Sequence, residues 1–231
     1  MLKILQTDKE YENNLKQYTK RDGILSFVLF GIMILNYSIL AVLQTKFEFI
    51  MLVGCIFNTL MIVITVLFIK LNKQSLETIG LYKGKWKNSI IMGIVFASFL
   101  FYNNCLSYLI NGSHFITLQE ILMLLVYYFL VAVCEEIVFR GYIGTRIYGL
   151  IKKRWLAVFV VGILFIAMHF PYRMLAYGMT LSDLTIKNFS WIIDLFITHL
   201  VLSFIYLKTN SLYGAIIPHW MSNFAYNIIL K

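Results

Sequence analysis

Charged residues, prolines, glycines and cysteines are all scarce in this sequence. Only 13% of the 231 residues are Asp, Glu, Lys or Arg, about half the fraction found in soluble globular domains, which excludes a soluble fold. Two prolines and 13 glycines likewise exclude a low-complexity or disordered chain. The three cysteines, Cys55, Cys105 and Cys134, lie in apolar stretches without paired spacing, so we expect them to pack as small hydrophobic residues and to form no disulfide bond.

Apolar residues dominate instead. They make up 60% of the chain, and the mean hydropathy is +0.78. The sequence predicts an all-α polytopic membrane helix bundle of about seven transmembrane helices, within a range of six to eight. No repeat or polar linker divides the chain, so we interpret residues 1–231 as one integral-membrane domain with a motif-bearing core at about 118–231. The expected spans are Gly23–Thr45, Phe49–Ile69, Ser89–Ile110, Ile121–Ile143, Trp155–Phe170, Trp191–Leu207 and Leu212–Leu230.

Positive charge is unevenly distributed along the chain. The formal net charge is +9, and most Lys and Arg residues lie in Met1–Asp22, Lys70–Lys87 and Arg140–Arg154. The positive-inside rule then predicts a multi-pass plasma-membrane protein with a cytoplasmic N-terminus and an extracytoplasmic C-terminus. We interpret the basic charge as a topology signal and a contact with anionic lipid at the cytoplasmic loops, not as a nucleic-acid face.

Four polar side chains fall at one depth on three predicted helices. At ~1.5 Å per residue from the cytoplasmic turns, Glu135 and His169 each lie roughly 16 Å into the membrane, and His219 and Asn223 about 12 and 18 Å. Such residues are costly in lipid and usually face a bundle interior or a water-filled cavity. This coincidence favours a functional cavity over a solvated helix end or a buried structural ion pair.

Spacing along the fourth span predicts how its charges are oriented. Glu136 and Arg140 are four residues apart, so they share a helix face and are expected to pair. Glu135 points about 100° away and is expected to face the cavity. Cys134 suggests a Cys–His protease only weakly, because an apolar setting makes a thiol inert.

Both prolines lie beside these polar residues. Pro218 removes one backbone hydrogen bond inside its helix, so we expect a kink that leaves the Gly214 carbonyl available to the cavity. Pro171 follows His169 and is expected to end span five. The segment 171–190 then has room for a re-entrant or extra short helix.

A carboxylate, two histidines and an amide around one wet pocket suit the hydrolysis of a peptide bond without a serine or cysteine nucleophile. The glutamate can take a proton from water, and one histidine can hold that water. The second histidine and the asparagine can donate hydrogen bonds to a developing oxyanion.

Three short motifs resemble those of a known family. They are "EEIVFR" at Glu135–Arg140, "FIAMH" at Phe165–His169 and "HWMSN" at His219–Asn223, and the flanking "FRGYI" and "TNSLYGAIIPHW" are similar as well. In order and spacing they resemble Glu-Glu-x-x-x-Arg, Phe-x-x-x-His and His-x-x-x-Asn or Asp of the CAAX-protease and bacteriocin-processing family, also called Abi, of intramembrane glutamic endopeptidases. The resemblance covers about half of the chain, Ile121–Leu230.

The resemblance implies a role for each motif residue. Glu135 would be the general base for the attacking water, and His169 would help to hold that water. His219 and Asn223 would stabilise the oxyanion. Two residues would orient the site, namely Glu136 and Arg140. No cofactor or metal is implied in this interpretation, and no substrate-binding residue is identified.

Two alternatives to a glutamic peptidase stay open. The first is a zinc-dependent membrane metalloprotease with Glu135, His169 and His219 as ligands, since these ligand types suit zinc; no His-Glu-x-x-His helix supports it, and Arg140 would partly neutralise a cation site. The second is a non-catalytic bacteriocin-immunity or transport-like membrane protein that uses the polar pocket to bind protons or a ligand.

Two further polar residues on span six belong to no motif, Asp194 and His199. His199 lies near the depth of the other histidines, roughly 14 Å from the cytoplasmic side. We expect it to be a packed structural histidine, with a supporting hydrogen bond to the site as the alternative.

The substrate is expected to be a membrane-associated peptide or protein. Eukaryotic relatives remove three residues from prenylated Cys-a-a-X tails. The composition, rich in Lys, Ile and Asn, indicates a bacterium, so the resemblance favours maturation of peptide pheromones or bacteriocins, bacteriocin immunity, or processing of a membrane-bound regulator.

Overall fold

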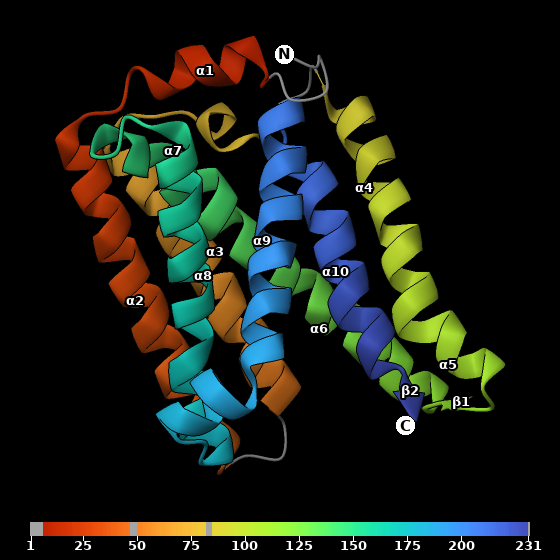
Figure 1. The fold of residues 1–231 in the computed structure, drawn as a ribbon. Helices are drawn as coiled ribbons and strands as arrows, with labels where there is room; N and C mark the ends of the chain where they lie inside the picture. Colours follow the sequence, from red (N-terminus) through yellow and green to blue (C-terminus); the bar gives the residue numbers. More distant parts are fainter. Residues whose placement is uncertain (1–6, 47–49, 82–84, 231) are drawn as a thin grey trace.

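A computed structural model describes residues 7–46, 50–81 and 85–230 of the chain. Parts of three predicted features, Met1–Asp22, Phe49–Ile69 and Lys70–Lys87, fall outside the described residues, as does Lys231. The fold is an all-α bundle, as predicted, with one two-residue antiparallel pair in which β1 (His114–Phe115) joins β2 (Ile229–Leu230) (Figure 1).

Ten α-helices make up the bundle, among the described residues. Their bounds are α1 Lys9–Leu15, α2 Lys20–Gln44, α3 Ile50–Leu71, α4 Trp86–Phe101, α5 Ser107–Ile110, α6 Leu118–Glu136, α7 Gly144–Arg146, α8 Arg154–Tyr177, α9 Phe189–Thr209 and α10 Tyr213–Asn227. Five short helical turns connect or extend them, namely η2 Leu76–Ile79, η3 Tyr102–Leu106, η4 Ile137–Ile143, η5 Ile147–Gly149 and η6 Asp183–Lys187.

Six helical stretches are long and apolar enough to cross a membrane, among the described residues. They are Lys20–Gln44, Met51–Leu71, Trp86–Ile110, Leu118–Gly149, Arg154–Tyr177 and Phe189–Thr209. These correspond to the first six predicted spans. The seventh is shorter than predicted, because α10 has 15 residues and rises only about 22 Å, less than the ~30 Å of a bilayer's hydrocarbon core. The number of long spans is therefore six, at the lower end of the predicted range.

Polar capping residues explain where two of the spanning helices begin. Thr19 accepts a hydrogen bond from the Asp22 amide, and the Asp22 side chain bonds back to the Thr19 amide, which closes a capping box at the start of α2. Thr117 and Glu120 form the same arrangement at the start of α6. Each box satisfies amide groups that would otherwise lack partners at a helix start.

Pro171 does not end the fifth span, so that prediction was wrong. The helix α8 continues through Pro171 to Tyr177 and ends where Gly178 adopts a left-handed φ of 64°. Proline removes only one hydrogen bond, to the Ala167 carbonyl, and membrane helices tolerate this loss when the surroundings satisfy the freed group. The segment 171–190 does contain a short extra helix, η6, as was foreseen.

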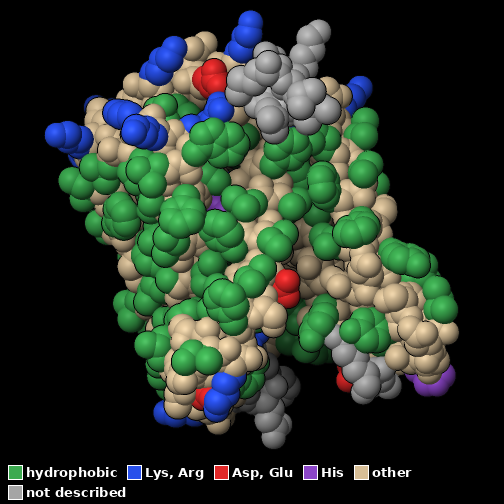
Figure 2. All heavy atoms as spheres, viewed as in Figure 1, with side chains coloured by type: hydrophobic (Ala, Val, Ile, Leu, Met, Phe, Trp, Pro, Cys, Tyr) green, Lys and Arg blue, Asp and Glu red, His purple; other side chains and the backbone are tan. Residues whose placement is uncertain are grey.

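The basic end of the molecule carries α1. In Figure 1 this helix lies across the ends of the long helices, and Tyr11 and Leu15 on its inner face are buried. The amide of Asp8 bonds to the Leu207 carbonyl at 3.0 Å, and Arg154 pairs with Glu12 at 2.8 Å. Figure 2 shows hydrophobic side chains over the flank of the bundle and most of the visible Lys and Arg at this end.

Two glycines let α4 and α10 approach closely. A Cβ atom added at Gly93 would lie 2.8 Å from the Gly214 carbonyl oxygen, and one at Gly214 would lie 2.3 Å from the Ser89 carbonyl. Small residues at crossings of membrane helices permit this kind of backbone contact. The Gly214 carbonyl therefore faces α4. The prediction that Pro218 makes this carbonyl available to the cavity was wrong, because the packing of α4 covers it.

Candidate active site

A buried network of charged residues joins α6, η4 and α10. Glu136 is fully buried, and its Oε1 accepts hydrogen bonds from Arg140 NH1 at 2.8 Å and from His219 Nδ1 at 2.6 Å. The predicted pairing of Glu136 with Arg140 is therefore confirmed. It persists although η4 is a π-helical turn, a geometry that often occurs at functional sites. One carboxylate thus fixes both a guanidinium and an imidazole.

Glu135 differs from its neighbour in the partner of its Oε1, while Oε2 of both residues is buried without a hydrogen-bond partner among the described residues. Its Oε1 accepts a hydrogen bond from the Tyr37 hydroxyl of α2 at 3.0 Å. Its Oε2 lies 3.6 Å from His219 Nε2, too far for a hydrogen bond, and is buried without a hydrogen-bond partner among the described residues. Glu135 therefore presents one fixed oxygen and one unengaged oxygen, the latter beside a histidine.

Phe165 packs at the centre of the site. The Arg140 guanidinium lies 4.6 Å from the centre of its ring, within cation–π range. The rings of His169, His199 and His219 surround it at 5.1, 5.9 and 6.2 Å between centroids. The ring of Phe165 separates the three imidazoles and supports the guanidinium. This is the physical reason for an aromatic residue one turn before His169 in the second motif.

His169 is oriented by its own helix. Its Nδ1 lies 2.8 Å from the Phe165 carbonyl, and because a carbonyl only accepts, Nδ1 carries the hydrogen. The neutral ring therefore has its lone pair on Nε2. The ring is half-buried and packs edge-to-face on Trp191 at 6.0 Å. His169 can thus accept a hydrogen bond from water through Nε2.

The same reasoning assigns the hydrogens of His219. The Glu136 carboxylate accepts from Nδ1, so Nε2, which faces Glu135, has a lone pair in the neutral ring and becomes a donor only in the imidazolium form. The Glu136 carboxylate thereby fixes which nitrogen of His219 faces Glu135. A role for His219 as a hydrogen-bond donor to an oxyanion therefore depends on Glu136.

Asn223 lies one turn beyond His219 on α10 and is half-buried. Its backbone carbonyl accepts a hydrogen bond from Asn227, and within the described part of the chain its amide makes no hydrogen bond to the other five motif residues. The structure therefore brings four of the motif residues into direct contact, namely Glu135, Glu136, Arg140 and His219. His169 packs against the ring of Phe165. Asn223 has no hydrogen bond to this group among the described residues.

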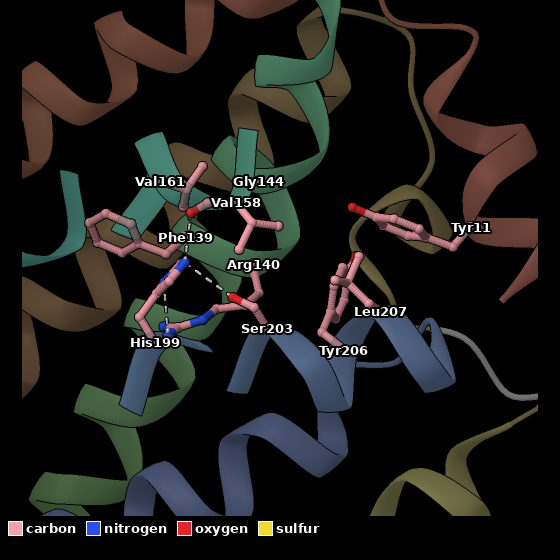
Figure 3. A pocket seen from close by; sticks show the side chains of 10 residues that line it. All are labelled: Tyr11, Phe139, Arg140, Gly144, Val158, Val161, His199, Ser203, Tyr206 and Leu207. Carbon is pink, nitrogen blue, oxygen red and sulfur yellow. Dashed lines mark hydrogen bonds between the residues drawn. The ribbon is translucent and has the colours of Figure 1, made fainter. Parts of the chain in front are cut away.

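His199 supports the site as well as packing in the core. Its Nδ1 accepts from Arg140 NH2 at 3.3 Å, while Nε2 donates to the Val158 carbonyl at 3.0 Å (Figure 3). The expectation of a merely structural histidine was therefore incomplete, and the alternative of a supporting hydrogen bond is what the geometry shows. Asp194, by contrast, is exposed on α9.

A small cavity lies behind Arg140, on the side of α1. It has about 20 Å³ of space and is lined by Arg140, His199, Ser203, Tyr206 and Tyr11, among others (Figure 3). The Arg140 Nε and the Tyr206 hydroxyl are buried and lack a hydrogen-bond partner within the described ranges. Their polarity suits bound water.

Tyr37 and Asn58 are site residues that the sequence motifs did not reveal. Asn58 on α3 is buried, and its Oδ1 lies 3.4 Å from the Tyr37 hydroxyl. The sequence did contain one indication of these site residues: Asn36, Tyr37 and Asn58 lie inside two spans without charge. Polar residues at membrane depth usually have a partner. Nothing in their spacing linked them to Glu135.

No group of three or more His, Cys, Asp or Glu side chains is arranged to hold a metal ion among the described residues. His219 Nδ1 is engaged by Glu136 and His169 Nδ1 by the Phe165 carbonyl, so only Nε2 of each ring is open to a further partner. We derive no chemical step through zinc. The three cysteines are free, as expected.

Comparison with protein families gives one match. The model described as type II CAAX prenyl endopeptidase Rce1-like matches residues 117–225. Neither the curated proteins nor the solved structures yield a match. The matched segment begins at the cap of α6 and includes all three motifs with α8, α9 and most of α10. Residues 117–225 are therefore similar to the CAAX-protease family of membrane peptidases.

Proposed function

We propose that the protein is an intramembrane endopeptidase that hydrolyses a peptide bond in a membrane-associated peptide or protein, using water activated by Glu135. The observation that carries this proposal is the state of Glu135: its Oε1 is held by Tyr37, while Oε2 is buried and unengaged within the described residues, 3.6 Å from His219 Nε2. A carboxylate oxygen of this kind is suited to accept a proton from water.

Each motif residue has a place in this reaction. Glu135 Oε2 takes a proton from water as the water oxygen attacks the peptide carbonyl carbon, and His169 Nε2 accepts the other water hydrogen as a hydrogen bond. The carbonyl oxygen becomes negative and accepts from the His219 imidazolium and from the Asn223 amide. Glu135 then returns its proton to the amine nitrogen as the carbon–nitrogen bond breaks, which restores the carboxylate.

Glu136 and Arg140 are positioning residues in this scheme. The Glu136 carboxylate orients His219 through its hydrogen bond to Nδ1, and Arg140 together with His199 holds Glu136 in place. This arrangement resembles in logic the carboxylate–histidine pairs of serine hydrolases, in which a buried acid orients an imidazole.

The family points to the substrate class. The matched family is that of type II CAAX prenyl endopeptidases. A lipid-modified or otherwise membrane-associated peptide suits a site enclosed by spanning helices, because the lipid anchor holds the scissile bond at the membrane. The absence of prenylated proteins in most bacteria favours pheromone- or bacteriocin-like peptides.

The proposal is tested by comparing the peptides in cells that carry the wild type and Glu135→Gln. We expect cleavage products to appear only with the wild type, and cleavage of a derived peptide by the purified variant to fall at least about 10²-fold. Glu77→Gln, at an exposed position of η2, is the matched control and should cleave normally. Near-normal cleavage by Glu135→Gln would refute the assignment, and retained cellular function without cleavage would favour the non-catalytic alternative.

A further inference from the structure

The contact between Tyr37 and Glu135 connects the site to a part of the chain outside the family match. Tyr37 belongs to α2, 98 positions before Glu135, and the matched segment starts only at residue 117. Both side chains are buried, with exposed fractions of 9% and 3%. Within the described residues, the Tyr37 hydroxyl is the hydrogen-bond donor to this carboxylate.

The direction of the hydroxyl hydrogen follows from its two acceptors. The Tyr37 oxygen is 3.0 Å from Glu135 Oε1 and 3.4 Å from Asn58 Oδ1. The Asn58 Nδ2 donates to the Gly54 carbonyl at 2.8 Å, which turns Oδ1 toward the tyrosine. A phenol has one hydrogen, and the nearer, charged acceptor is the carboxylate. The hydroxyl therefore donates to Glu135, with Asn58 as the second acceptor beside it.

The ring of Tyr37 is itself held in place. It packs edge-to-face against Tyr172 of α8 at 6.4 Å between centroids. Tyr37 is thus supported by α8 while it reaches α6, so the position of its hydroxyl is set by the bundle as well as by the carboxylate. A donor held in this way restrains the rotation of the Glu135 carboxylate about its last bond.

We propose that Tyr37 is a positioning residue for the catalytic carboxylate: it occupies Oε1 and thereby leaves Oε2 as the atom that takes the proton of water. This inference rests on the proposed role of Glu135 as the base. It assigns the first spanning helix a part in the chemistry, because α2 supplies the donor.

The test is Tyr37→Phe, which keeps the ring and its packing and removes only the hydroxyl. With a peptide found by the comparison of cells described above as substrate, we expect kcat per folded molecule to fall about ten- to a hundredfold with KM unchanged. This is the scale of one lost hydrogen bond to a charged group. Tyr18→Phe is the matched control, since it removes a buried hydroxyl that bonds to the Thr78 carbonyl near α1. It should leave kcat unchanged.

A coupled variant separates positioning from general loosening of the fold. In the Glu135→Gln background, Tyr37→Phe should cause no further loss of the residual rate, because the carboxylate it positions is gone. A kcat within twofold of the wild type for Tyr37→Phe, or an equal additional loss in both backgrounds, would overturn the inference. If Glu135→Gln is inactive while Tyr37→Phe is fully active, only the role of Tyr37 fails; if Glu135→Gln is active, the proposed function fails.

Discussion

Replacing Glu136 by Gln should destabilise the protein far more than the same replacement at its neighbour. Glu136 is fully buried and is the counter-charge of Arg140, whose side chain is also buried. Gln keeps the size and an acceptor oxygen but removes the charge, so the guanidinium loses its ion-pair partner and keeps direct contacts with the neutral His199 and the face of Phe165. Breaking a buried ion pair in this way costs about 3–5 kcal/mol.

Glu135→Gln should not carry this cost of an unpaired buried charge, because Glu135 has no Arg or Lys ion-pair partner in the described residues. Its one hydrogen bond, from Tyr37, is one that Gln can also accept. For a chain of this length, about 1 kcal/mol corresponds to roughly 2–4 °C in Tm, so Glu136→Gln should lower Tm by about 6–20 °C and Glu135→Gln by about 2 °C or less. Thermal unfolding of the purified proteins in one detergent measures both.

A compensating variant makes the cause of the loss visible. Changing Arg140 to Met in the Glu136→Gln protein removes the unpaired charge, and an apolar side chain of similar length fills its space. We expect Tm to recover by more than half, with activity still absent. Equal Tm values for Glu136→Gln and Glu135→Gln, or no recovery in the double variant, would refute the argument that buried charge balance holds this network together.

Three further predictions concern the reaction and the topology. Asn223→Ala should lower kcat about 10²–10³-fold. Asn223→Asp should regain activity as the pH falls, because only the protonated carboxyl can donate to the oxyanion. An equal loss of folded protein in both variants, with unchanged kcat per folded molecule, would remove Asn223 from the site. Activity should survive exhaustive chelation, and elemental analysis should find no stoichiometric zinc; one tightly bound metal per chain whose return alone restores activity would establish the metalloprotease alternative. A reporter fused after Lys153 should be cytoplasmic and one after Lys231 extracytoplasmic, and a cytoplasmic C-terminus would contradict the predicted topology.

The relationships within single helices were predictable from the sequence. The pair Glu136–Arg140 follows from a four-residue spacing, which places two side chains on one helix face whatever the rest of the fold does. The position of Glu135, His169 and His219 along their respective helices follows from the rise per residue and from the position of the charged turns. The all-α membrane class follows from composition, since only closed hydrogen bonding within helices suits such an apolar chain.

Proline shows the limit of local rules. Both predictions about proline rested on the hydrogen bond that each proline removes. The helix α8 nevertheless continues past Pro171. The Gly214 carbonyl, which Pro218 leaves without its helical partner, is covered by α4. Whether a helix ends or continues after losing one bond depends on how its neighbours satisfy the freed group, which no local pattern contains.

The sequence by itself determined which residues are the candidates for the chemistry, and only the tertiary structure decided how they are connected. The bond from Tyr37 to Glu135, the two nitrogens of His219 directed at two different glutamates, and the support of Arg140 by His199 all join different helices. Such contacts depend on the rotation and tilt of whole helices, and these are set by packing, for example by the close crossing at Gly93 and Gly214. Periodicity along one helix specifies a face but not what lies opposite to it.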